Sequence, residues 1–455
     1  MAGLASSAAR SGRSRITIRI KSKNRRAFPL LLVILILLLL RSLNLFTNMT
    51  AHTTSTTTAL PTVILKPREA DRIVAGHPWV YGSGIMYVPE SVADGDLVEL
   101  KDHRKHWIGI GLYNAKSKIT VRVITHEHVT VDQSFFEARI RAALALRQRH
   151  LPGASSFRVV SSEGDFLSGL IVDKYDDMLV VQTSALGMDM RKPLILAALK
   201  SIFSPRAIVE RNEMASRKFE GLPEANGILE GALDGPVTVT LNGLKFETDL
   251  RAGHKTGLYL DQQVNYQRTA ELIALTPGAN VLDCFTFLGG FALHAARAGA
   301  THVHGLDQSA DAIAAATRNA AANGLAEKCT FEAANVFDWL KAHTTVGPHE
   351  KLIPKFDAIV LDPPSFTRNR ASVPDALRGY KEIHLRALKL IKPGGLLATF
   401  CCSHHVDAVT FQDVILSAAF DTPPHLAPRR HVHAIAGPSL HPQHPGDGVS
   451  EGLRV

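Results

Sequence analysis

Two short segments near the end of the chain carry groups that could take part directly in a reaction. In the segment FDAIVLDPPSF an apolar run ends at Asp362 and is followed by two prolines. A second apolar run, LLATFC, leads into Cys401, Cys402 and Ser403. Proline fixes its own φ and restricts the residue before it to extended conformations, so Asp362 is expected to be held rigidly where its strand ends. The sequence therefore predicts a carboxylate and a thiol at neighbouring strand ends.

A thiol and a carboxylate side by side suit one kind of ring chemistry. Carbon 5 of cytosine is a poor nucleophile, but a thiolate that adds to carbon 6 makes an enamine whose carbon 5 can attack a methyl sulfonium. Asp362 would donate a proton or a hydrogen bond at nitrogen 3. Strand alternation puts Cys401 and Cys402 on opposite faces, so at most one of them is catalytic. The alternative for each is a small buried apolar residue.

A second group of residues is typical of a site for an adenosine-containing ligand. One strand ends at Asp283, a loop reaches Gly289 and Gly290, and the next strand ends at Asp307. Glycines allow the backbone to approach a ligand, and the second carboxylate can accept hydrogen bonds from ribose hydroxyls. The spacing is not GxGxxG, which favours S-adenosylmethionine (SAM) over a dinucleotide. Asn335, after a third strand, either meets the adenine edge or caps a helix.

The elements that must position these residues fall into three segments. Residues 62–126 contain short β-branched and aromatic runs divided by turns, typical of a compact barrel or sandwich. Residues 127–235 mix helix and strand patterns, with a helix expected over 133–150. In 236–455 a hairpin at Asn242 and Gly243 is followed by alternating strands and helices, which predicts a mainly parallel sheet covered on both faces.

Residues 1–48 differ from the rest of the chain. They hold nine Lys and Arg and no Asp or Glu, so residues 49–455 contain 42 basic and 42 acidic side chains, although the whole chain has a net charge of +9. The apolar run 27–40 is shorter than the roughly 18 to 20 residues that span a membrane. We favour translated sequence ahead of a start at Met49 over a short membrane anchor or a signal peptide. A Thr-rich linker, 49–61, follows.

The cysteines and histidines carry no metal-site spacing. The four cysteines contain no CxxC pair, so we expect a reducing compartment and a cytoplasmic protein, with no membrane association unless the leader is genuine. Histidines gather near the C-terminus without a helical i, i+4 pair and a third ligand, so we expect no bound metal. They include His404, His405, His431, His433, His441 and His444.

With these residues in view, the chain over 62–435 resembles the bacterial SAM-dependent ribosomal RNA methyltransferases of the RlmI type, which make 5-methylcytosine in large-subunit RNA. HPWVYGSGI and the following strands resemble the N-terminal PUA domain, an RNA-binding module. The resemblance to the family's central domain rests on the segments SSEGDFLSGLIVDKY and IVERN. The resemblance to its catalytic domain rests on GHKTGLYLDQ, VLDCFTFLGGF, DPPSF and CCS. The resemblance implies a class I Rossmann-like sheet, preceded by a small PUA-like β-barrel and an α+β domain.

The resemblance also implies roles for particular residues. The family nucleophile is the middle residue of a Ser-Cys-Ser-like triplet, which falls on Cys402, with Asp362 as its catalytic partner. The residues expected to bind SAM are Asp283, Phe285, Gly289, Gly290, Asp307, Asn335 and Asp362. The chain departs from the family at Leu288, where Thr is usual, and at Asn335, which is often Asp. Its ending, GPSLHPQHPGDGVSEGLRV, lacks the usual motifs, so the last strand is expected to be missing or frayed.

An RNA surface must be a local patch, because residues 49–455 carry no net charge. The candidates are Lys66, Arg68, Arg72, Arg104, Lys105, Arg368 and Arg370, with His106 beside the second group. A base inside a duplex cannot present its ring to both a thiol and SAM, so a flipped or loop cytosine is expected.

Two alternatives stay open: methylation of a guanine nitrogen or an exocyclic amine, and a non-catalytic RNA-binding or assembly factor. The oligomeric state, with a homodimer as one option, stays open as well.

Overall fold

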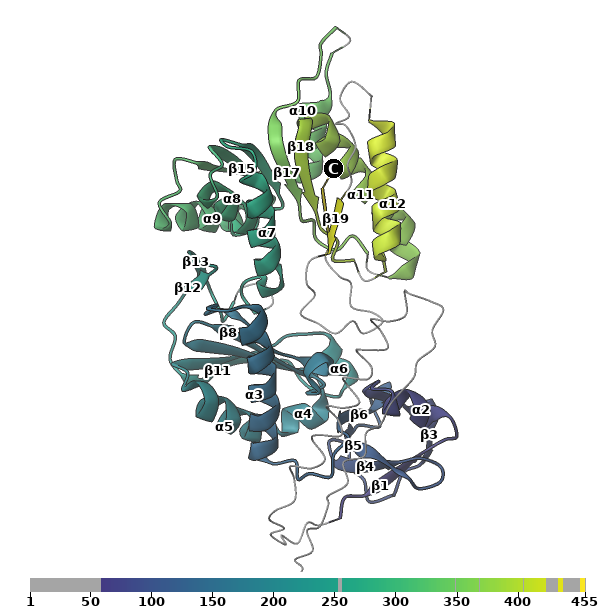
Figure 1. Cartoon of the computed structure of the whole chain (residues 1–455). Helices are drawn as coiled ribbons and strands as arrows, with labels where there is room; N and C mark the ends of the chain where they lie inside the picture. Colours follow the sequence, from purple (N-terminus) through teal and green to yellow (C-terminus); the bar gives the residue numbers. More distant parts are fainter. Residues whose placement is uncertain are drawn as a thin grey trace, which may run out of the picture. The chain divides into compact units, whose positions relative to one another are not determined.

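The computed structural model (Figure 1) describes most of the chain beyond the expected leader. The described residues are 59–252, 256–347, 349–367, 369–403, 405–422, 433–436 and 451–454. Residues 1–48 and Arg368 therefore lie outside them, as do most of the linker and several of the C-terminal histidines. Among the described residues, every helix is too short or too polar to cross a bilayer.

The first segment forms a six-stranded sheet around a small core. The spatial order of its strands is β2-β6-β5-β4-β1-β3. The core contains Val63, Leu100 and Val121, all fully buried, so the alternating apolar runs of the sequence do form the expected strands. A short helix that the sequence pattern did not reveal follows the first strand. The elements are β1 (Thr62–Leu65), α2 (Glu69–Val74), β2 (Trp79–Tyr81), η1 (Gly82–Gly84), β3 (Ile85–Tyr87), β4 (Leu97–Lys101), β5 (Trp107–Tyr113) and β6 (Ile119–Thr125).

The central segment is a five-stranded mixed sheet, ordered β11-β10-β9-β8-β7, with helices packed on one face. The helix expected over 133–150 is present as α3, and the Asp132 side chain caps it by accepting a hydrogen bond from Phe135 N at 3.1 Å. The elements are α3 (Gln133–His150), β7 (Phe157–Ser161), η2 (Ser162–Asp165), β8 (Leu170–Tyr175), β9 (Met178–Thr183), α4 (Leu186–Met190), α5 (Lys192–Phe203), β10 (Ala207–Asn212), α6 (Ser216–Phe219) and β11 (Ala225–Gly231).

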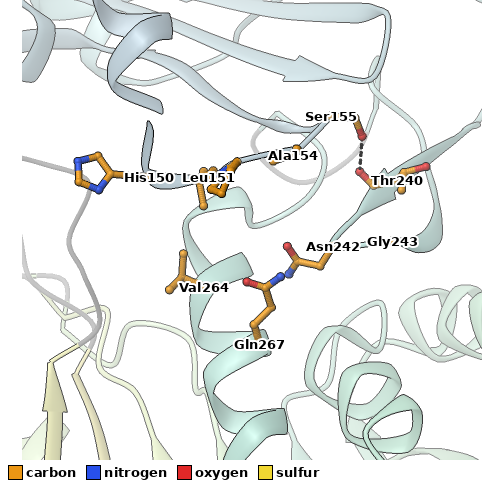
Figure 2. A pocket seen from close by; sticks show the side chains of 11 residues that line it. His150, Leu151, Ala154, Ser155, Thr240, Asn242, Gly243, Val264 and Gln267 are labelled. Carbon is orange, nitrogen blue, oxygen red and sulfur yellow. Dashed lines mark hydrogen bonds between the residues drawn. The ribbon is translucent and has the colours of Figure 1, made fainter. Parts of the chain in front are cut away.

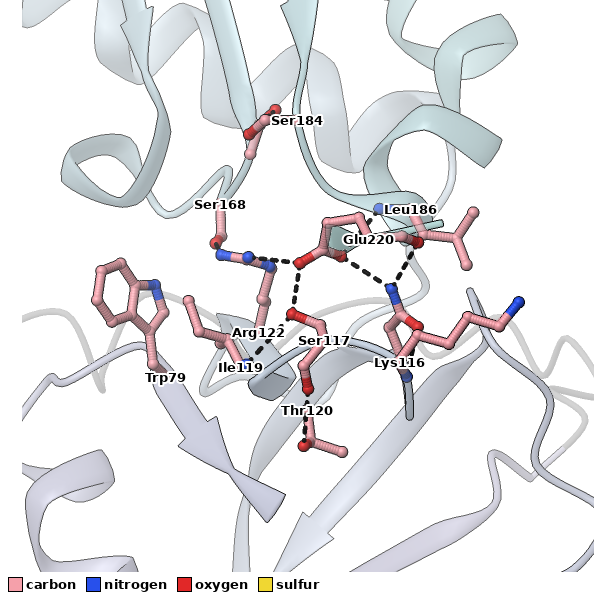
Figure 3. Close-up of polar contacts among 12 residues, drawn as sticks. Trp79, Lys116, Ser117, Ile119, Thr120, Arg122, Ser168, Ser184, Leu186 and Glu220 are labelled. Atoms are coloured by element: carbon pink, nitrogen blue, oxygen red, sulfur yellow. Dashed lines mark hydrogen bonds and ion pairs between the residues drawn. The ribbon is translucent and has the colours of Figure 1, made fainter. Parts of the chain in front are cut away.

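A buried carboxylate joins these two segments. Glu220, in the loop after α6, is 4% exposed and forms an ion pair with Arg122 of β6 at 2.8 Å. Asn114 Nδ2 and the backbone N–H of Leu186 donate to its other oxygen at 2.9 and 3.3 Å. Figure 3 shows Glu220 between Arg122, Ser117 and Leu186. Ser117 donates to the oxygen that Arg122 contacts. The charge of Glu220 is therefore fully hydrogen-bonded, which a buried charge requires.

The last segment is a five-stranded parallel sheet with helices on both faces, as the sequence predicts. Its strand order is β16-β15-β14-β17-β18, preceded by the hairpin β12-β13. At the hairpin turn φ is 52° for Asn242 and 77° for Gly243, the left-handed conformation that this pair adopts readily. The elements are β12 (Val237–Leu241), β13 (Leu244–Thr248), η3 (Leu260–Gln262), α7 (Gln263–Ile273), β14 (Asn280–Cys284), α8 (Gly290–Arg297), β15 (His302–Asp307), α9 (Ala310–Ala322), β16 (Cys329–Ala333), α10 (Val336–Thr344), β17 (Phe356–Leu361), η4 (Arg370–Ser372), α11 (Val373–Leu390), β18 (Ile391–Thr399) and α12 (Ala408–Asp421).

Two apolar layers hold this sheet in place. On one face Val281 and Val303 pack with α7, α8 and α9, and on the other Leu282 and Ile359 pack with α10, α11 and α12. All five strands run parallel, so their carboxyl ends meet at one edge. That edge is where open α/β sheets bind ligands.

The C-terminal stretch contains a separate pair of strands. Strand β19 (His433–Ala436) pairs antiparallel with β20 (Glu451–Arg454). The expectation of a missing or frayed last strand therefore needs correction. A strand is present, and its hydrogen-bonded partner is β19 in a two-stranded sheet of their own, where Ile435 pairs with Gly452.

Candidate functional site

The carboxylate of Asp362 is fixed by a side chain that lies 100 residues earlier. Asp362 follows β17, and its backbone N–H donates to Cys284 O at 3.4 Å. Gln262 Nε2 donates to both of its carboxylate oxygens at 3.1 Å. The amide of Gln262 is itself oriented by Asn265 Nδ2, which donates to Gln262 Oε1 at 2.6 Å. Gln262 and Asn265 are both 8% exposed, so this chain of amides sets the direction in which the carboxylate points.

The adjacent cysteines lie in different environments. Cys401 is buried, and its thiol donates to Tyr380 Oη at 3.4 Å. Cys402 is exposed, and its thiol donates to Pro363 O at 3.5 Å. Pro363 is the residue after Asp362, so the exposed thiol and the carboxylate belong to neighbouring loops at the same edge of the sheet. An exposed thiol can reach a substrate, whereas the buried one serves packing.

Ser403 ties the two loops together. It is 1% exposed, and its Oγ accepts the backbone N–H of Phe366 at 3.2 Å. The same oxygen contacts Ser365 Oγ at 3.2 Å and Tyr380 Oη at 2.8 Å. Phe366 packs against the Tyr380 ring, with 4.6 Å between ring centroids. The loop that begins at Asp362 is thus anchored at its far end to the residue directly after Cys402.

Asp283 is buried below the glycine loop. It is 0% exposed, and its Oδ2 accepts hydrogen bonds from Thr286 Oγ1 at 2.6 Å and from Ala292 N at 2.9 Å. These bonds connect the end of β14 to the loop and to the first turn of α8. Burial raises the pKa of Asp283 to about 7, although both hydrogen bonds act in the opposite direction. Among the described residues, its Oδ1 has no hydrogen-bond partner and is an acceptor left for another group.

The loop after β14 has an uncommon backbone. Phe285, Phe287 and Gly289 have φ of 67°, 49° and 86°, and left-handed φ at two phenylalanines is rare. A Cβ added to Gly290 would lie 2.6 Å from the Tyr266 ring, so this position requires glycine. Strain of this kind is found at ligand sites, where the loop must take one conformation. The expected residues Phe285, Gly289 and Gly290 therefore lie together.

Asp307 and Asn335 hold the neighbouring turns. Asp307 accepts Phe287 N on Oδ2 and Ser309 N on Oδ1, both at 3.0 Å, so it fixes the glycine loop and the start of α9. The Asn335 oxygen accepts Phe337 N at 2.9 Å and Asp338 N, so it caps α10. The sequence left two roles open for Asn335, and its side-chain oxygen has the role of helix cap.

These groups suit an adenosine-containing sulfonium cofactor. The strained glycine loop, the carboxylate of Asp307 at the end of β15 and the unsatisfied oxygen of Asp283 meet at the carboxyl edge of the sheet. Tyr259 stands beside them, with its ring 5.3 Å from that of Phe287. Burial, and then the nearby Asp362, raise the pKa of Tyr259, so its hydroxyl stays protonated and can donate a hydrogen bond.

One cavity lies apart from this cluster, and another adjoins it. One of about 490 Å³ is lined by the loop after α3, the hairpin turn at Asn242 and helix α7, including Gln267 (Figure 2). The other, of about 380 Å³, shares Tyr259 with the site. Among the described residues, no His, Cys, Asp and Glu side chains gather in a group that could hold a metal ion.

The basic candidates for RNA contact are mostly exposed and partly paired. Lys66 Nζ donates to Ser83 O at 2.7 Å, and Arg72 pairs with Glu69 at 3.3 Å. Arg68, Arg104, Lys105 and Arg370 are exposed, while Arg368 lies outside the described residues. The described ones lie in two groups on the first segment, around α2 and at the β4-β5 turn, and at one position of the last segment.

Several residues of the site could not be found from the sequence pattern. Gln262, Asn265, Tyr380 and Ser403 orient or anchor the expected groups, and Tyr259 adjoins them. Gln262 stands in GHKTGLYLDQ, one of the segments that resemble the family's catalytic domain, but neither its composition nor its spacing assigns a role to Gln262. Only the fold brings it to Asp362.

Two segments of the chain match models of known protein families. A family model for a PUA-like domain matches residues 63–126. A second model, for an S-adenosylmethionine-dependent methyltransferase, matches residues 225–441. The chain therefore has a PUA-like domain and a SAM-dependent methyltransferase domain.

Relatives and solved structures agree with these matches. The chain is 38% identical to a ribosomal RNA large subunit methyltransferase I of Shewanella amazonensis over 78% of its own length and 89% of the relative. It is 38% identical to the protein of the same name from Aeromonas hydrophila, over 79% and 89%. The fold matches SMU.776, a methyltransferase complexed with SAH, with a TM-score of 0.69, 18% identity, and coverage of 87% of this chain and all of that one. A SAM-dependent methyltransferase from Streptococcus mutans gives a TM-score of 0.67 at 17% identity, with the same coverage of both chains.

Proposed function

Because this chain belongs to the ribosomal RNA large subunit methyltransferase I family, we propose that it transfers a methyl group from SAM to large-subunit ribosomal RNA. We further propose that the product is 5-methylcytosine, with Cys402 as the nucleophile and Asp362 as its partner. SAM, held by the glycine loop and Asp307, supplies an electrophilic methyl group. The rest of the reaction depends on side chains of this chain.

The proposed reaction has three steps. Cys402 loses its proton to solvent, and the thiolate forms a bond to carbon 6 of cytosine. The electron pair of the 5,6 double bond then moves towards carbon 5 and nitrogen 3, where Asp362, as the carboxylic acid, donates a hydrogen bond. Carbon 5 would then take the methyl group and become tetrahedral, while the bond between that methyl group and the sulfonium sulfur breaks and leaves the neutral thioether SAH. Finally a base in solution removes the proton from carbon 5, the double bond re-forms, and the thiolate leaves. Gln262 orients Asp362 throughout through its two hydrogen bonds.

One observation carries this proposal. The exposed thiol of Cys402 contacts the loop of Asp362 at 3.5 Å, while Cys401 is buried and bonded to Tyr380. A nucleophile for a base must be accessible, and of the two cysteines only Cys402 is. A cytosine must also leave a duplex to reach this edge, so the proposed substrate is a flipped or single-stranded base. Since its substrate is ribosomal RNA, we place the enzyme in the cytoplasm.

The adjacent cysteines provide a matched test. The full-length protein, Cys402→Ala and Cys401→Ala are assayed for transfer of labelled methyl from SAM to large-subunit RNA that lacks the modification. We expect Cys402→Ala to lose transfer and Cys401→Ala to keep it. Transfer by Cys402→Ala would instead indicate a guanine nitrogen or an exocyclic amine as acceptor. If none of the three proteins binds SAM by calorimetry, the protein is a non-catalytic RNA-binding or assembly factor.

A further inference from the structure

The cavity of about 380 Å³ beside Tyr259 lies on the uncovered part of one face of the central sheet. Helices α3 and α5 pack on the opposite face. Ile171 of β8 and Gln182 of β9 are directly paired across the sheet and therefore share this face. The wall opposite them is the segment that leads to the catalytic site, Thr256 and Leu258 to Asp261. The central domain and the catalytic domain thus build the cavity together.

The cavity adjoins the reacting groups. Tyr259 lines it and also packs edge-on against Phe287 of the glycine loop, at 5.3 Å. Asp261 lines it as well, and the next residue is Gln262, which holds Asp362. A nucleotide bonded to the one that is methylated would therefore be within reach of this cavity. Cavities of a few hundred cubic ångströms are large enough for a small ligand or a nucleoside.

The charges lining the cavity do not suit a phosphate. Among the described residues, Arg158 is the one basic side chain in the lining, and it is already paired with the buried Asp173 through Nε at 2.8 Å and Nη2 at 2.9 Å. The lining also contains the carboxylates of Glu213 and Asp261. A phosphate would meet two negative charges and a neutralised positive one.

The lining does suit an uncharged nucleobase. Ile171, Met214 and Leu258 are apolar, and Tyr259 offers an aromatic ring, a surface on which every base can stack. Gln182 Nε2 donates to Arg211 O at 2.7 Å, which orients the amide. Within the described part of the chain, no group donates to Gln182 Oε1, so it remains an acceptor for an N–H of a base. We infer that this cavity is a subsite for the base of an RNA nucleotide that flanks the methylated one.

This inference rests on the proposed function, since it requires an RNA substrate. Its test compares Gln182→Leu with Gln267→Leu, which makes the same change in the other cavity (Figure 2). Steady-state methyl transfer is measured with the full-length proteins and unmodified large-subunit RNA. We expect Gln182→Leu to raise KM for RNA about 5- to 20-fold, the effect of losing one or two hydrogen bonds, with kcat within about twofold. Gln267→Leu should match the parent protein. Equal KM for all three proteins would overturn the subsite.

A second measurement identifies the occupant. Short RNA substrates carry an abasic residue at each position next to the target in turn. One such substrate should raise KM for the parent protein by the same factor as Gln182→Leu, with no further rise when the two changes are combined. If the rises in KM from the abasic substrate and from Gln182→Leu multiply when the two are combined, the base and Gln182 act separately. If Gln182→Leu fails to fold, Met214→Ala replaces it. If neither the parent protein nor any variant transfers methyl, the proposed catalysis is wrong. The affinities of the same proteins for RNA, measured in the presence of SAH, then decide whether the subsite exists.

Discussion

Gln262 Nε2 donates to both carboxylate oxygens of Asp362, at 3.1 Å each. The bond connects the first turn before α7 to the end of β17, and Asn265 orients the amide that makes it. Gln262 touches the carboxylate, so it is a positioning residue for whatever Asp362 does. The geometry of the carboxylate is thereby set by the protein before a substrate arrives.

Removing this amide should slow the reaction without affecting substrate binding. We expect Gln262→Leu to lower kcat by about 10- to 100-fold, because small displacements of a catalytic group cost factors of this size. KM for RNA and Kd for SAM should change less than about threefold. Gln267→Leu, at an exposed position of α7, is the control. An equal loss of SAM affinity and kcat in Gln262→Leu would assign Gln262 to the cofactor site instead.

Asp307 should matter for SAM affinity. Its two oxygens hold the glycine loop and the start of α9 at 3.0 Å, and it stands where ribose hydroxyls would be bound. We expect Asp307→Ala to raise Kd for SAM by about 10- to 100-fold, as measured by calorimetry. Asp311→Ala, in the exposed first turn of α9, should leave Kd unchanged. Unchanged affinity in Asp307→Ala would place the cofactor elsewhere.

Asp283 should make stability depend on pH. Burial raises its pKa to about 7 in the folded protein, against about 3.9 for an unfolded chain. A raised carboxyl pKa contributes stability that is present below about pH 4 and lost as the pH rises through 7. Relative to Asp283→Asn, the free energy of unfolding of the parent protein should therefore fall by about 4 kcal/mol between pH 4 and pH 8. Chemical denaturation at several pH values measures this, and parallel curves for the two proteins would contradict it.

Glu220 should stabilise the contact between the PUA-like and central domains. Burial raises its pKa, but the charge of Arg122 and the hydrogen bonds from Ser117 and Asn114 outweigh this, so the net pKa is lowered. We expect Glu220→Gln to lose about 3 kcal/mol of stability at pH 7, because it leaves Arg122 without its closest partner. A lowered pKa contributes stability only above about pH 4, so the loss should shrink below that pH.

The exposed neighbour Glu224 gives the control for this change. It pairs with Lys218 at 3.9 Å, with its side chain 55% exposed, and an exposed pair of this kind contributes little. Glu224→Gln should stay within about 0.5 kcal/mol of the parent protein. A similar loss in both variants would show that the burial of Glu220 is not the reason for its effect.

The sequence predicted the groups at the strand ends because strand patterns are local. Apolar runs closed by Asp283, Asp307 and Asp362 form the expected parallel strands, and Asn242-Gly243 forms the expected turn. The six-residue helix α2 was missed: it is too short for a periodic signal, and its first residue follows Arg68, whose φ of 71° nothing in the sequence indicates.

The support around the site could not be predicted, because it depends on contacts between distant residues. Gln262 and Asp362 are 100 residues apart, and Arg122 and Glu220 are 98 apart. Periodicity says which face of an element is buried but not which polar side chain of another element meets it. For Asn335 the sequence left a ligand contact and a cap equally open, and the hydrogen bonds to Phe337 and Asp338 identify the cap.

Cys402, as the nucleophile that forms 5-methylcytosine, is the residue on which the proposed reaction depends most. The most direct measurement is nucleoside mass spectrometry of large-subunit ribosomal RNA from a strain that lacks this protein and is complemented with the parent, Cys401→Ala or Cys402→Ala form. We predict that one 5-methylcytosine is lost on deletion, restored by the parent and by Cys401→Ala, and not restored by Cys402→Ala at equal protein levels. Restoration by Cys402→Ala, or loss of a different modified nucleoside, would contradict this role of Cys402.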